Sequence, residues 1–178
     1  MNDRERIVQD LAARVRSVPD FPVQGILFRD ITPILQDAAS YKAAIELFVQ
    51  RFRDRGVHVF AGIESRGFLF AAPLALALGA SFVPVRKGGK LPAATVRRTY
   101  DLEYGEATLE MHRDAVAPGA RVAIVDDLLA TGGTARAACE MVEELGGRVV
   151  ELAFLIELEA LAGRKQLAGR TVTTFLRY

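Results

Sequence analysis

The stretch of residues 122–134 constrains the fold of this chain more than any other part of its sequence. It begins with four apolar residues, continues with two adjacent acids, and then enters a loop of small and hydroxyl-bearing residues. An unbroken apolar run is typical of a strand buried on both faces of a parallel sheet, and ligands of such sheets bind beyond the carboxyl ends of the strands. The stretch therefore predicts an α/β fold, with a mainly parallel sheet flanked by helices and a ligand site just after residue 125.

The loop that follows the acids has the properties of a phosphate site. Apolar residues recur at helical spacing over residues 135–145, so the loop precedes a helix whose free N–H groups and dipole favour a phosphate. Its glycines let the backbone approach a ligand closely, and its threonines add hydroxyl donors. The loop consists of Ala130, Thr131, Gly132, Gly133 and Thr134.

The two acids, Asp126 and Asp127, lie too close to this loop to bind the phosphate themselves. Carboxylates suit hydroxyl groups, or a divalent metal through its waters. A ribose 5-phosphate offers both a phosphate for the loop and a 2′,3′-diol for the acids. The alternative is an ordinary strand, turn and helix in which the acids cap the turn. Two acids joined to a buried strand and a threonine-flanked glycine pair favour the ligand site.

Two further loops place cations at the same edge of the predicted sheet. Ser65 and Arg66 follow the first central strand, and the next strand is followed by Arg86, Lys87 and Lys90. Neighbouring cations on a glycine-rich loop can offset the dense negative charge of a diphosphate. The alternatives are a solvated arginine in a turn and a solubilising surface loop. The shared position at the carboxyl edge of the sheet favours a function.

The rest of the chain alternates between predicted strands and helices, which implies βαβ units. Strands are expected over residues 57–63, 81–85, 121–125, 149–156 and 171–176. Helices are expected over residues 4–15, after residue 37, up to residue 78, up to residue 145, and near residue 161. The prolines and glycine of residues 19–30 predict an irregular stretch. Residues 86–113 predict a loop with a β-hairpin, and long loops of this kind often act as lids.

Composition excludes several classes of protein. With 178 residues, 51% of them hydrophobic, the chain can form one well-cored domain, and its net charge of +1 gives no general footprint for nucleic acid. The single cysteine, Cys139, falls on the apolar face of a predicted helix and is expected in the core. Residues 67–85 carry no charge, but Pro73, Gly79 and Pro84 divide them into a helix and a strand rather than a membrane span. We therefore expect a soluble, cytoplasmic protein without a membrane or nucleic-acid partner.

Three short motifs accompany residues 122–134. They are Phe28-Arg29-Asp30-Ile31, Ser65-Arg66-Gly67-Phe68 and Leu102-Glu103-Tyr104-Gly105. Together they resemble the adenine branch of the type I phosphoribosyltransferase family over essentially the whole chain. The resemblance implies that family's fold in one domain over residues 1–178, with an N-terminal hood over residues 1–35 and a hairpin flap over residues 94–113. It also implies a homodimeric, Mg²⁺-dependent transferase of purine salvage that converts adenine and 5-phosphoribosyl 1-diphosphate to AMP and diphosphate.

The resemblance also implies a role for each matching residue. It places the 5′-phosphate on residues 130–134 and the ribose hydroxyls on Asp126 and Asp127, with Mg²⁺ near these acids but held mainly by substrate and water. The diphosphate would meet Ser65, Arg66, Arg86, Lys87 and Lys90. The adenine would meet Leu27, Phe28 and Arg29. The catalytic residues would be Glu103, Tyr104 and Arg66, with Glu103 handling the proton that leaves the purine.

Two other functions remain open. A transferase for hypoxanthine or xanthine needs donors for a 6-oxo group, commonly a lysine, and residues 1–35 contain no lysine. A non-catalytic ligand sensor that acts on DNA or RNA usually carries an added domain or a basic face, for which 178 residues of balanced charge leave little room. His58 and His112 lack a matching constellation, so neither is assigned a role.

Overall fold

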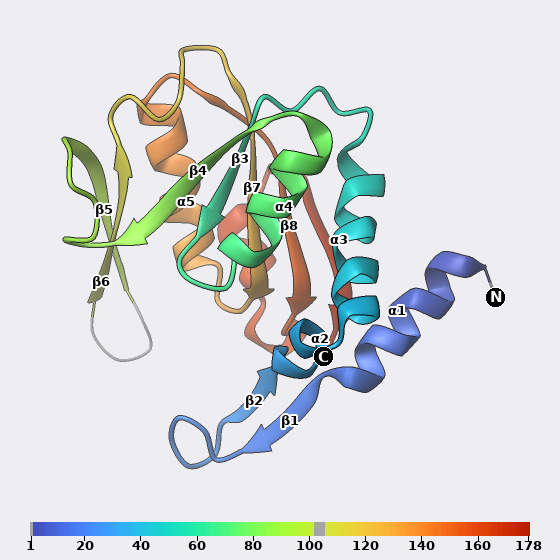
Figure 1. Cartoon of the computed structure of the whole chain (residues 1–178). Coiled ribbons are helices and arrows are strands. Elements are labelled where there is room, and N and C mark those ends of the chain that lie inside the picture. Colours follow the sequence, from blue (N-terminus) through green and yellow to red (C-terminus); the bar gives the residue numbers. More distant parts are fainter. Residues whose placement is uncertain (1, 102–105) are drawn as a thin grey trace. The chain divides into compact units, whose positions relative to one another are not determined.

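The structure is a computed structural model that describes residues 2–101 and 106–178 (Figure 1). Its backbone divides into two compact units, Met1–Gln50 and Arg51–Tyr178. The single domain with its hood and flap, predicted above, stays a prediction. Among the described residues, no helix is long and apolar enough to cross a membrane.

The N-terminal unit is built from helices and a short hairpin. Its elements are α1 (Asp3–Arg14), β1 (Arg16–Pro19), β2 (Leu27–Asp30), α2 (Thr32–Gln36) and α3 (Ala38–Phe52), whose last residues belong to the second unit. A capping box starts α1: the Asn2 side chain accepts the Glu5 N–H at 2.8 Å, and the Glu5 carboxylate accepts the Asn2 N–H at 3.0 Å. The helix predicted after residue 37 is α3.

The hairpin β1–β2 corrects the expectation that residues 19–30 are irregular throughout. Arg16 pairs with Asp30 in antiparallel register, and Pro19 pairs with Leu27. An ion pair reinforces the first of these pairs, because Arg16 Nη2 lies 2.5 Å from Asp30 Oδ2. Strands of four residues are too short to show a hydrophobic period, so the sequence revealed the connecting turn but not the strand after it.

The C-terminal unit carries a seven-stranded sheet in the order β5-β6-β4-β3-β7-β8-β9. Its strands are β3 (Val59–Ile63), β4 (Ser81–Lys87), β5 (Thr95–Asp101), β6 (Glu106–His112), β7 (Arg121–Leu129), β8 (Arg148–Glu157) and β9 (Val172–Arg177). Its helices are α4 (Phe68–Leu78), α5 (Gly133–Glu144) and the 3₁₀ helices η1 (Glu159–Leu161) and η2 (Gly163–Leu167). The pairs β3–β4, β3–β7, β7–β8 and β8–β9 are parallel, whereas β6 joins β4 and β5 antiparallel. The prediction of a mainly parallel sheet is confirmed.

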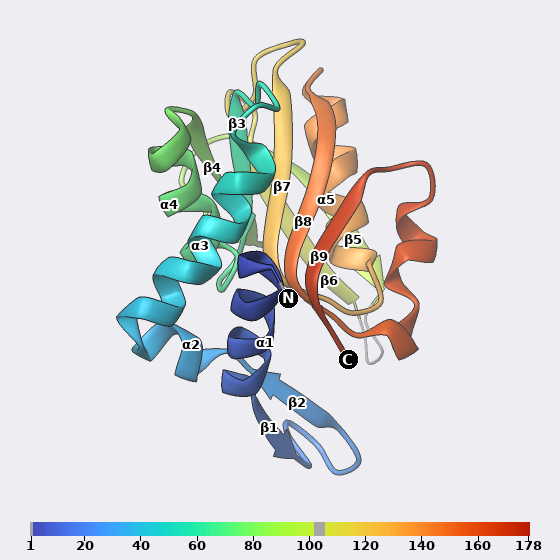
Figure 2. The same cartoon turned by 90° about the vertical axis from the view of Figure 1, so that its right-hand side faces the viewer.

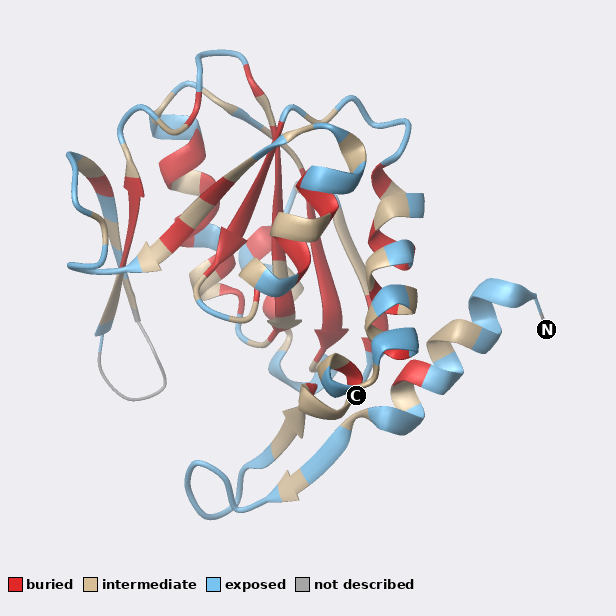
Figure 3. Cartoon of the chain, viewed as in Figure 1, coloured by how far each residue is buried: buried red, intermediate tan, exposed pale blue. Residues whose placement is uncertain are grey.

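Burial on both faces explains the apolar central strands. Figure 2 shows α4 on one face of the sheet and α5 on the other, and Figure 3 shows that the central strands are almost wholly buried. Cys139 of α5 is fully buried in this core, as predicted. Burial raises the pKa of its thiol to about 12.

Strand β7 is longer than predicted. The sequence predicts an end at Val125, but the strand runs to Leu129, so both acids lie within it. The reason is its neighbour: Leu128 pairs with Ile156 and Leu129 with Glu157 of β8. Parallel pairing beyond the acids extends the ladder up to the loop that precedes α5.

Candidate functional site

The carboxyl ends of the central strands enclose a hollow of about 380 Å³, called here the main hollow. Its lining comes from the ends of β3, β4 and β7, from β5, and from the start of α5. The lining residues are Ile63, Glu64, Ser65, Arg66, Lys87, Tyr100, Asp126, Asp127, Leu128 and Thr134. The hollow thus brings together one residue or more from the predicted acid pair, from both cation-bearing loops and from the predicted phosphate loop.

Asp127 is the most buried charge of the main hollow. Its side chain is 5% exposed, and Arg66 Nε lies 2.7 Å from its Oδ2. The two atoms form an ion pair without the alignment of a hydrogen bond, so the buried Oδ2 has a charge partner but no aligned donor. Burial raises the pKa of Asp127, and Arg66 opposes the rise only in part.

Asp126 is also shifted towards its neutral form. Burial, and then the neighbouring charge of Asp127, raise the pKa of Asp126 well above its ordinary value. Its Oδ1 accepts the backbone N–H of Asp127 at 2.8 Å. The ionisation of each acid therefore affects that of the other. A ligand that donates hydrogen bonds to them favours their ionised forms.

Four of the five residues of the phosphate loop, residues 130–134, line a smaller hollow of about 80 Å³, called here the loop hollow. They are Ala130, Thr131, Gly132 and Thr134. This hollow shares Asp126, Leu128 and Thr134 with the main hollow. Gly132 precedes the first residue of α5 with φ +88°, a conformation that glycine adopts readily. The first N–H groups of α5 have no partner within the helix, which suits an anion placed in the loop hollow.

The cation loop, residues 86–92, is held by a carboxylate that the sequence interpretation did not assign. Glu64 Oε2 accepts Arg86 Nε at 3.1 Å and the Lys87 N–H at 3.0 Å. Arg86 Nη1 also donates to the Lys90 carbonyl at 3.1 Å. Burial raises the pKa of Glu64, but the hydrogen bonds that Glu64 accepts from Arg86 and Lys87 outweigh burial and hold the pKa below its ordinary value. Lys87 lines the main hollow, whereas Arg86 and Lys90 are absent from its described lining.

A second unassigned carboxylate, Glu110, ties the cation loop to the hairpin. It is 1% exposed in β6, and its Oε2 accepts the Gly89 N–H at 3.0 Å. The Nε atom of Arg97, in β5, lies 2.8 Å from the other carboxylate oxygen, Oε1. The sequence offered one signal for this residue, a single charge between the apolar residues Leu109 and Met111. Its partners are distant in sequence and could not be read from the pattern.

The residues predicted to contact adenine belong to β2 in the N-terminal unit. Leu27 is 49% exposed, the Phe28 ring packs edge-on against Phe21 at 5.1 Å between centroids, and Arg29 donates to the Ser17 hydroxyl at 2.5 Å. The predicted catalytic residues Glu103 and Tyr104 lie outside the described residues.

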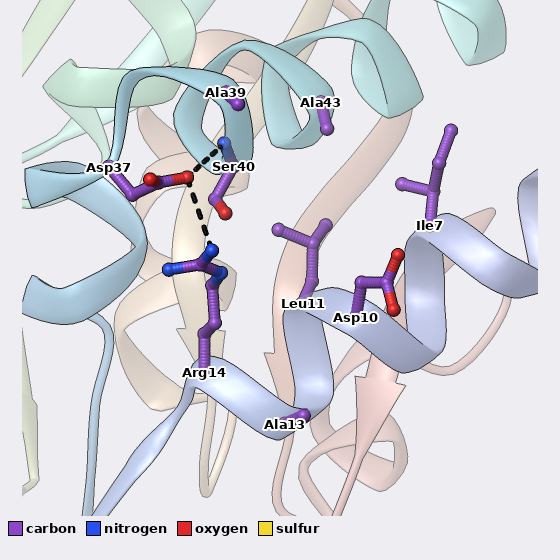
Figure 4. A pocket seen from close by; sticks show the side chains of 9 residues that line it. All are labelled: Ile7, Asp10, Leu11, Ala13, Arg14, Asp37, Ala39, Ser40 and Ala43. Atoms are coloured by element: carbon purple, nitrogen blue, oxygen red, sulfur yellow. Dashed lines mark hydrogen bonds and ion pairs between the residues drawn. The ribbon is translucent and has the colours of Figure 1, made fainter.

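The N-terminal unit has a larger hollow of about 480 Å³, between α1 and the start of α3 (Figure 4). Its one lining arginine, Arg14, lies 3.6 Å from Asp37, which also accepts the Ser40 N–H at 2.8 Å. The Ser40 hydrogen bonds lower the pKa of Asp37, so the acid stays ionised beside the arginine. Asp10 also lines this hollow, so its two carboxylates outnumber its one arginine, and it offers a phosphorylated ligand less than the two hollows beside β7 do.

Within the described residues, no three or more His, Cys, Asp or Glu side chains gather as a metal cage. A pair of carboxylates is different, because Mg²⁺ usually binds through one or two of them together with water and substrate phosphates. Asp126 and Asp127, with the unaligned Oδ2, fit that kind of shared site.

Comparisons with known proteins agree with this geometry. A model of the phosphoribosyl transferase domain family matches residues 30–174. An adenine phosphoribosyltransferase of Solibacter usitatus is 58% identical over 169 residues, which is 95% of this chain and 98% of the relative.

Solved structures show the same likeness. The crystal structure of the Thermoanaerobacter pseudethanolicus adenine phosphoribosyltransferase has a TM-score of 0.94 at 50% identity, covering 96% of this chain and 99% of that one. The Saccharomyces cerevisiae enzyme, solved with an imino-altritol bisphosphate and adenine, has a TM-score of 0.92 at 41% identity, covering 97% and 99%. The chain belongs to the adenine phosphoribosyltransferase family.

Proposed function

We infer that the chain is an enzyme that transfers the phosphoribosyl group of 5-phosphoribosyl 1-diphosphate to adenine, giving AMP and diphosphate. One observation carries this inference beyond family membership. The main hollow and the loop hollow meet at Asp126 and Thr134. A ribose ring placed at that junction would have anion-binding groups on both sides, as a sugar with phosphates at both ends requires.

Each part of the substrate can be assigned to residues of the two hollows. The 5′-phosphate fits the loop hollow at the start of α5, and the ribose hydroxyls donate to Asp126 and Asp127. The diphosphate then lies along Ser65, Arg66 and Lys87 in the main hollow. Arg86 and Lys90 add positive charge from the cation loop, although Glu64 already pairs with Arg86.

The chemistry follows from charge. The bond between C1′ and the diphosphate breaks as the bond between C1′ and the purine nitrogen forms, so positive charge develops on the sugar and negative charge on the leaving group. Arg66 and Lys87 stabilise the leaving group, and the phosphate loop holds C1′ in line with the base. Arg66 faces Asp127 at 2.7 Å, so binding of the diphosphate competes with this ion pair for the arginine.

We extend the proposal to Mg²⁺, which would supply additional positive charge to the diphosphate. Asp126 and Asp127 would hold the hydrated ion together with substrate oxygens. The proposals for adenine contact by Leu27 to Arg29, proton transfer by Glu103 and a role for Tyr104 rest on the sequence motifs alone. A cytoplasmic location is likewise a prediction from the sequence.

We also propose a homodimer that covers α4. This helix is apolar almost all round, a composition typical of a buried helix, yet Leu76 is 85% exposed and Leu69 39% exposed. A second copy of the chain would cover them. Leu76→Asp should shift the protein from dimer to monomer by size-exclusion chromatography with light scattering, whereas Leu161→Asp, at another exposed leucine, should leave the dimer intact. A dimer in both variants would contradict the α4 interface.

One assay tests the proposed reaction. Purified protein, Mg²⁺ and 5-phosphoribosyl 1-diphosphate are mixed separately with adenine, hypoxanthine or guanine, and diphosphate release is followed. Release with adenine alone is expected. Release with hypoxanthine but not adenine would overturn the choice of base, and no release with any base would favour a ligand sensor. Omitting Mg²⁺ in the presence of a chelator should abolish the release if the metal proposal is right.

A further inference from the structure

The segment after β8 packs its backbone directly against the phosphate loop. A Cβ atom added to Gly163, the first residue of η2, would lie 2.2 Å from the Ala130 carbonyl oxygen. A Cβ added to Gly132 would lie 2.4 Å from the Gly163 carbonyl oxygen. Both obstructions are backbone atoms, which cannot rotate away as a flexible side chain can. The phosphate loop and η2 are therefore in contact at two glycines, one from each segment.

An ion pair between a half-exposed arginine and a buried carboxylate fixes η2 at this position. Arg164 donates from Nε and Nη2 to the two oxygens of Glu157, at 2.7 and 2.8 Å. The same guanidinium reaches β9, at the Val172 carbonyl (3.1 Å) and the Thr174 hydroxyl (3.0 Å). The Glu157 carboxylate is 6% exposed, and the hydrogen bond from Arg164 is the main reason that its pKa lies below the ordinary value. A bidentate pair of this kind sets both position and orientation.

The pairing of strands β7 and β8 connects the ion pair to the phosphate loop. Glu157 is the last residue of β8, and its partner in β7 is Leu129, the residue that immediately precedes the phosphate loop. The Leu158 N–H donates to the Leu129 carbonyl at 2.9 Å. The position of η2 is thus transmitted to the loop both through the sheet and through the glycine contact.

From these contacts we propose that Gly163 and the Glu157–Arg164 pair are positioning residues for the 5′-phosphate subsite. None of the three residues is among the described residues that line the loop hollow; they support the backbone of residues 130–132 and so set the affinity for the phosphate. The proposal rests on the proposed function, because that function assigns the 5′-phosphate to this loop.

The proposal predicts which ligands lose affinity. In Gly163→Ala, the new Cβ would have to move from 2.2 Å to at least 3.4 Å from the Ala130 carbonyl oxygen to reach an ordinary contact. A misplacement of about 1 Å in an active site can cost on the order of 100-fold in rate. The KM for 5-phosphoribosyl 1-diphosphate and the Kd for ribose 5-phosphate should therefore rise about tenfold or more. The Kd for diphosphate and the KM for adenine, ligands without a 5′-phosphate, should stay within about twofold.

Two further variants make the test independent of whether Gly163→Ala folds. Glu157→Gln keeps the shape of the side chain but removes its charge, and should weaken ribose 5-phosphate binding with no change in diphosphate binding. Lys165→Ala is the matched control, because Lys165 lies on the same 3₁₀ helix, is exposed, and should leave both affinities unchanged. Calorimetric titration with ribose 5-phosphate and with diphosphate measures both affinities without turnover.

The outcomes separate the two proposals. Selective loss of ribose 5-phosphate affinity in Gly163→Ala or Glu157→Gln supports the positioning role. Equal loss of both ligands, or no loss of either in the folded variants, overturns it. If the wild-type protein binds ribose 5-phosphate but releases no diphosphate from 5-phosphoribosyl 1-diphosphate in the presence of adenine, the proposed reaction fails while the same titrations still decide the positioning role.

Discussion

Replacing Asp127 by asparagine separates the structural role of this acid from its proposed role in ribose binding. The substitution removes a charge that is 5% exposed and lies 2.7 Å from Arg66 Nε, while keeping a side chain of nearly the same shape. Burial already raises the pKa of Asp127, so the protein itself disfavours the charged form when the site holds no ligand. An uncharged asparagine avoids that cost of desolvation.

The expected magnitudes differ between stability and binding. Breaking a fully buried ion pair costs about 3–5 kcal/mol, but the Arg66 side chain is 41% exposed and can be solvated once its partner is neutral. The free energy of unfolding should therefore change by no more than about 1 kcal/mol, as for a solvent-exposed pair. A hydrogen bond from a ribose hydroxyl to a carboxylate is worth about 1.5–3 kcal/mol, so the Kd for ribose 5-phosphate should rise roughly 10- to 150-fold.

The assay compares two ligands of the same site. Titrations of wild type and Asp127→Asn with ribose 5-phosphate and with diphosphate should show loss of the first and retention or strengthening of the second, because Arg66 is released for the diphosphate. Asp114→Asn, at an exposed position, is the control and should alter neither. If diphosphate binding and the free energy of unfolding fall together in Asp127→Asn, the acid is chiefly a support for Arg66, and the reasoning is refuted.

Three further outcomes are expected. Gly67→Ala should lower the melting temperature by several degrees or prevent folding, because its Cβ would lie 2.6 to 2.7 Å from backbone atoms of β3 and β7. The control is Gly88→Ala, whose Cβ would meet nothing closer than 3.6 Å and which should melt as wild type does. Asp30→Asn should lower the free energy of unfolding at pH 7, because hydrogen bonds from Thr32 lower the Asp30 pKa to about 2. The ionised carboxylate contributes its full stabilisation above the ordinary pKa of 3.8. In denaturant titrations, the difference from wild type should therefore vanish as the pH falls through about 2. Ribose 5-phosphate should release protons on binding, since hydroxyl donors favour the ionised form of Asp126, whose pKa burial has raised. Calorimetry in buffers of different ionisation enthalpy measures this release, and equal observed heats in all buffers would contradict it.

Local and periodic features were the ones that could be predicted from the sequence. The apolar residues 122–125 indicate a buried strand, and the glycines that follow them indicate a loop with a freely adjustable backbone. Because both signals lie within one short stretch of sequence, the parallel sheet and the place of the phosphate loop could be inferred. The end of β7 could not, because it depends on pairing with β8, which begins 19 residues after β7 ends. The hairpin of β1 and β2 was missed for a related reason, since its strands are stabilised by each other and are too short to show a period.

The unpredicted parts of the site are supports rather than ligand contacts. Glu64 and Glu110 hold the cation loop, and Gly163 lies against the phosphate loop, through contacts between segments that are far apart in the chain. A carboxylate in a sequence looks the same whether it faces water or accepts a buried N–H. The residues proposed to touch the substrate carry a chemical signature, whereas those that position them are revealed only by three-dimensional contacts.

The burial of Cys139 has a practical consequence for spectroscopy. It is the one cysteine of the chain, it is fully buried, and its thiol has a pKa of about 12, so very little thiolate exists at neutral pH to react with maleimides or nitroxide reagents. A cysteine introduced at an exposed position such as Lys165 would react alone. A fluorophore or spin label attached there could follow the region around η2 as ligands bind, without first removing a native thiol.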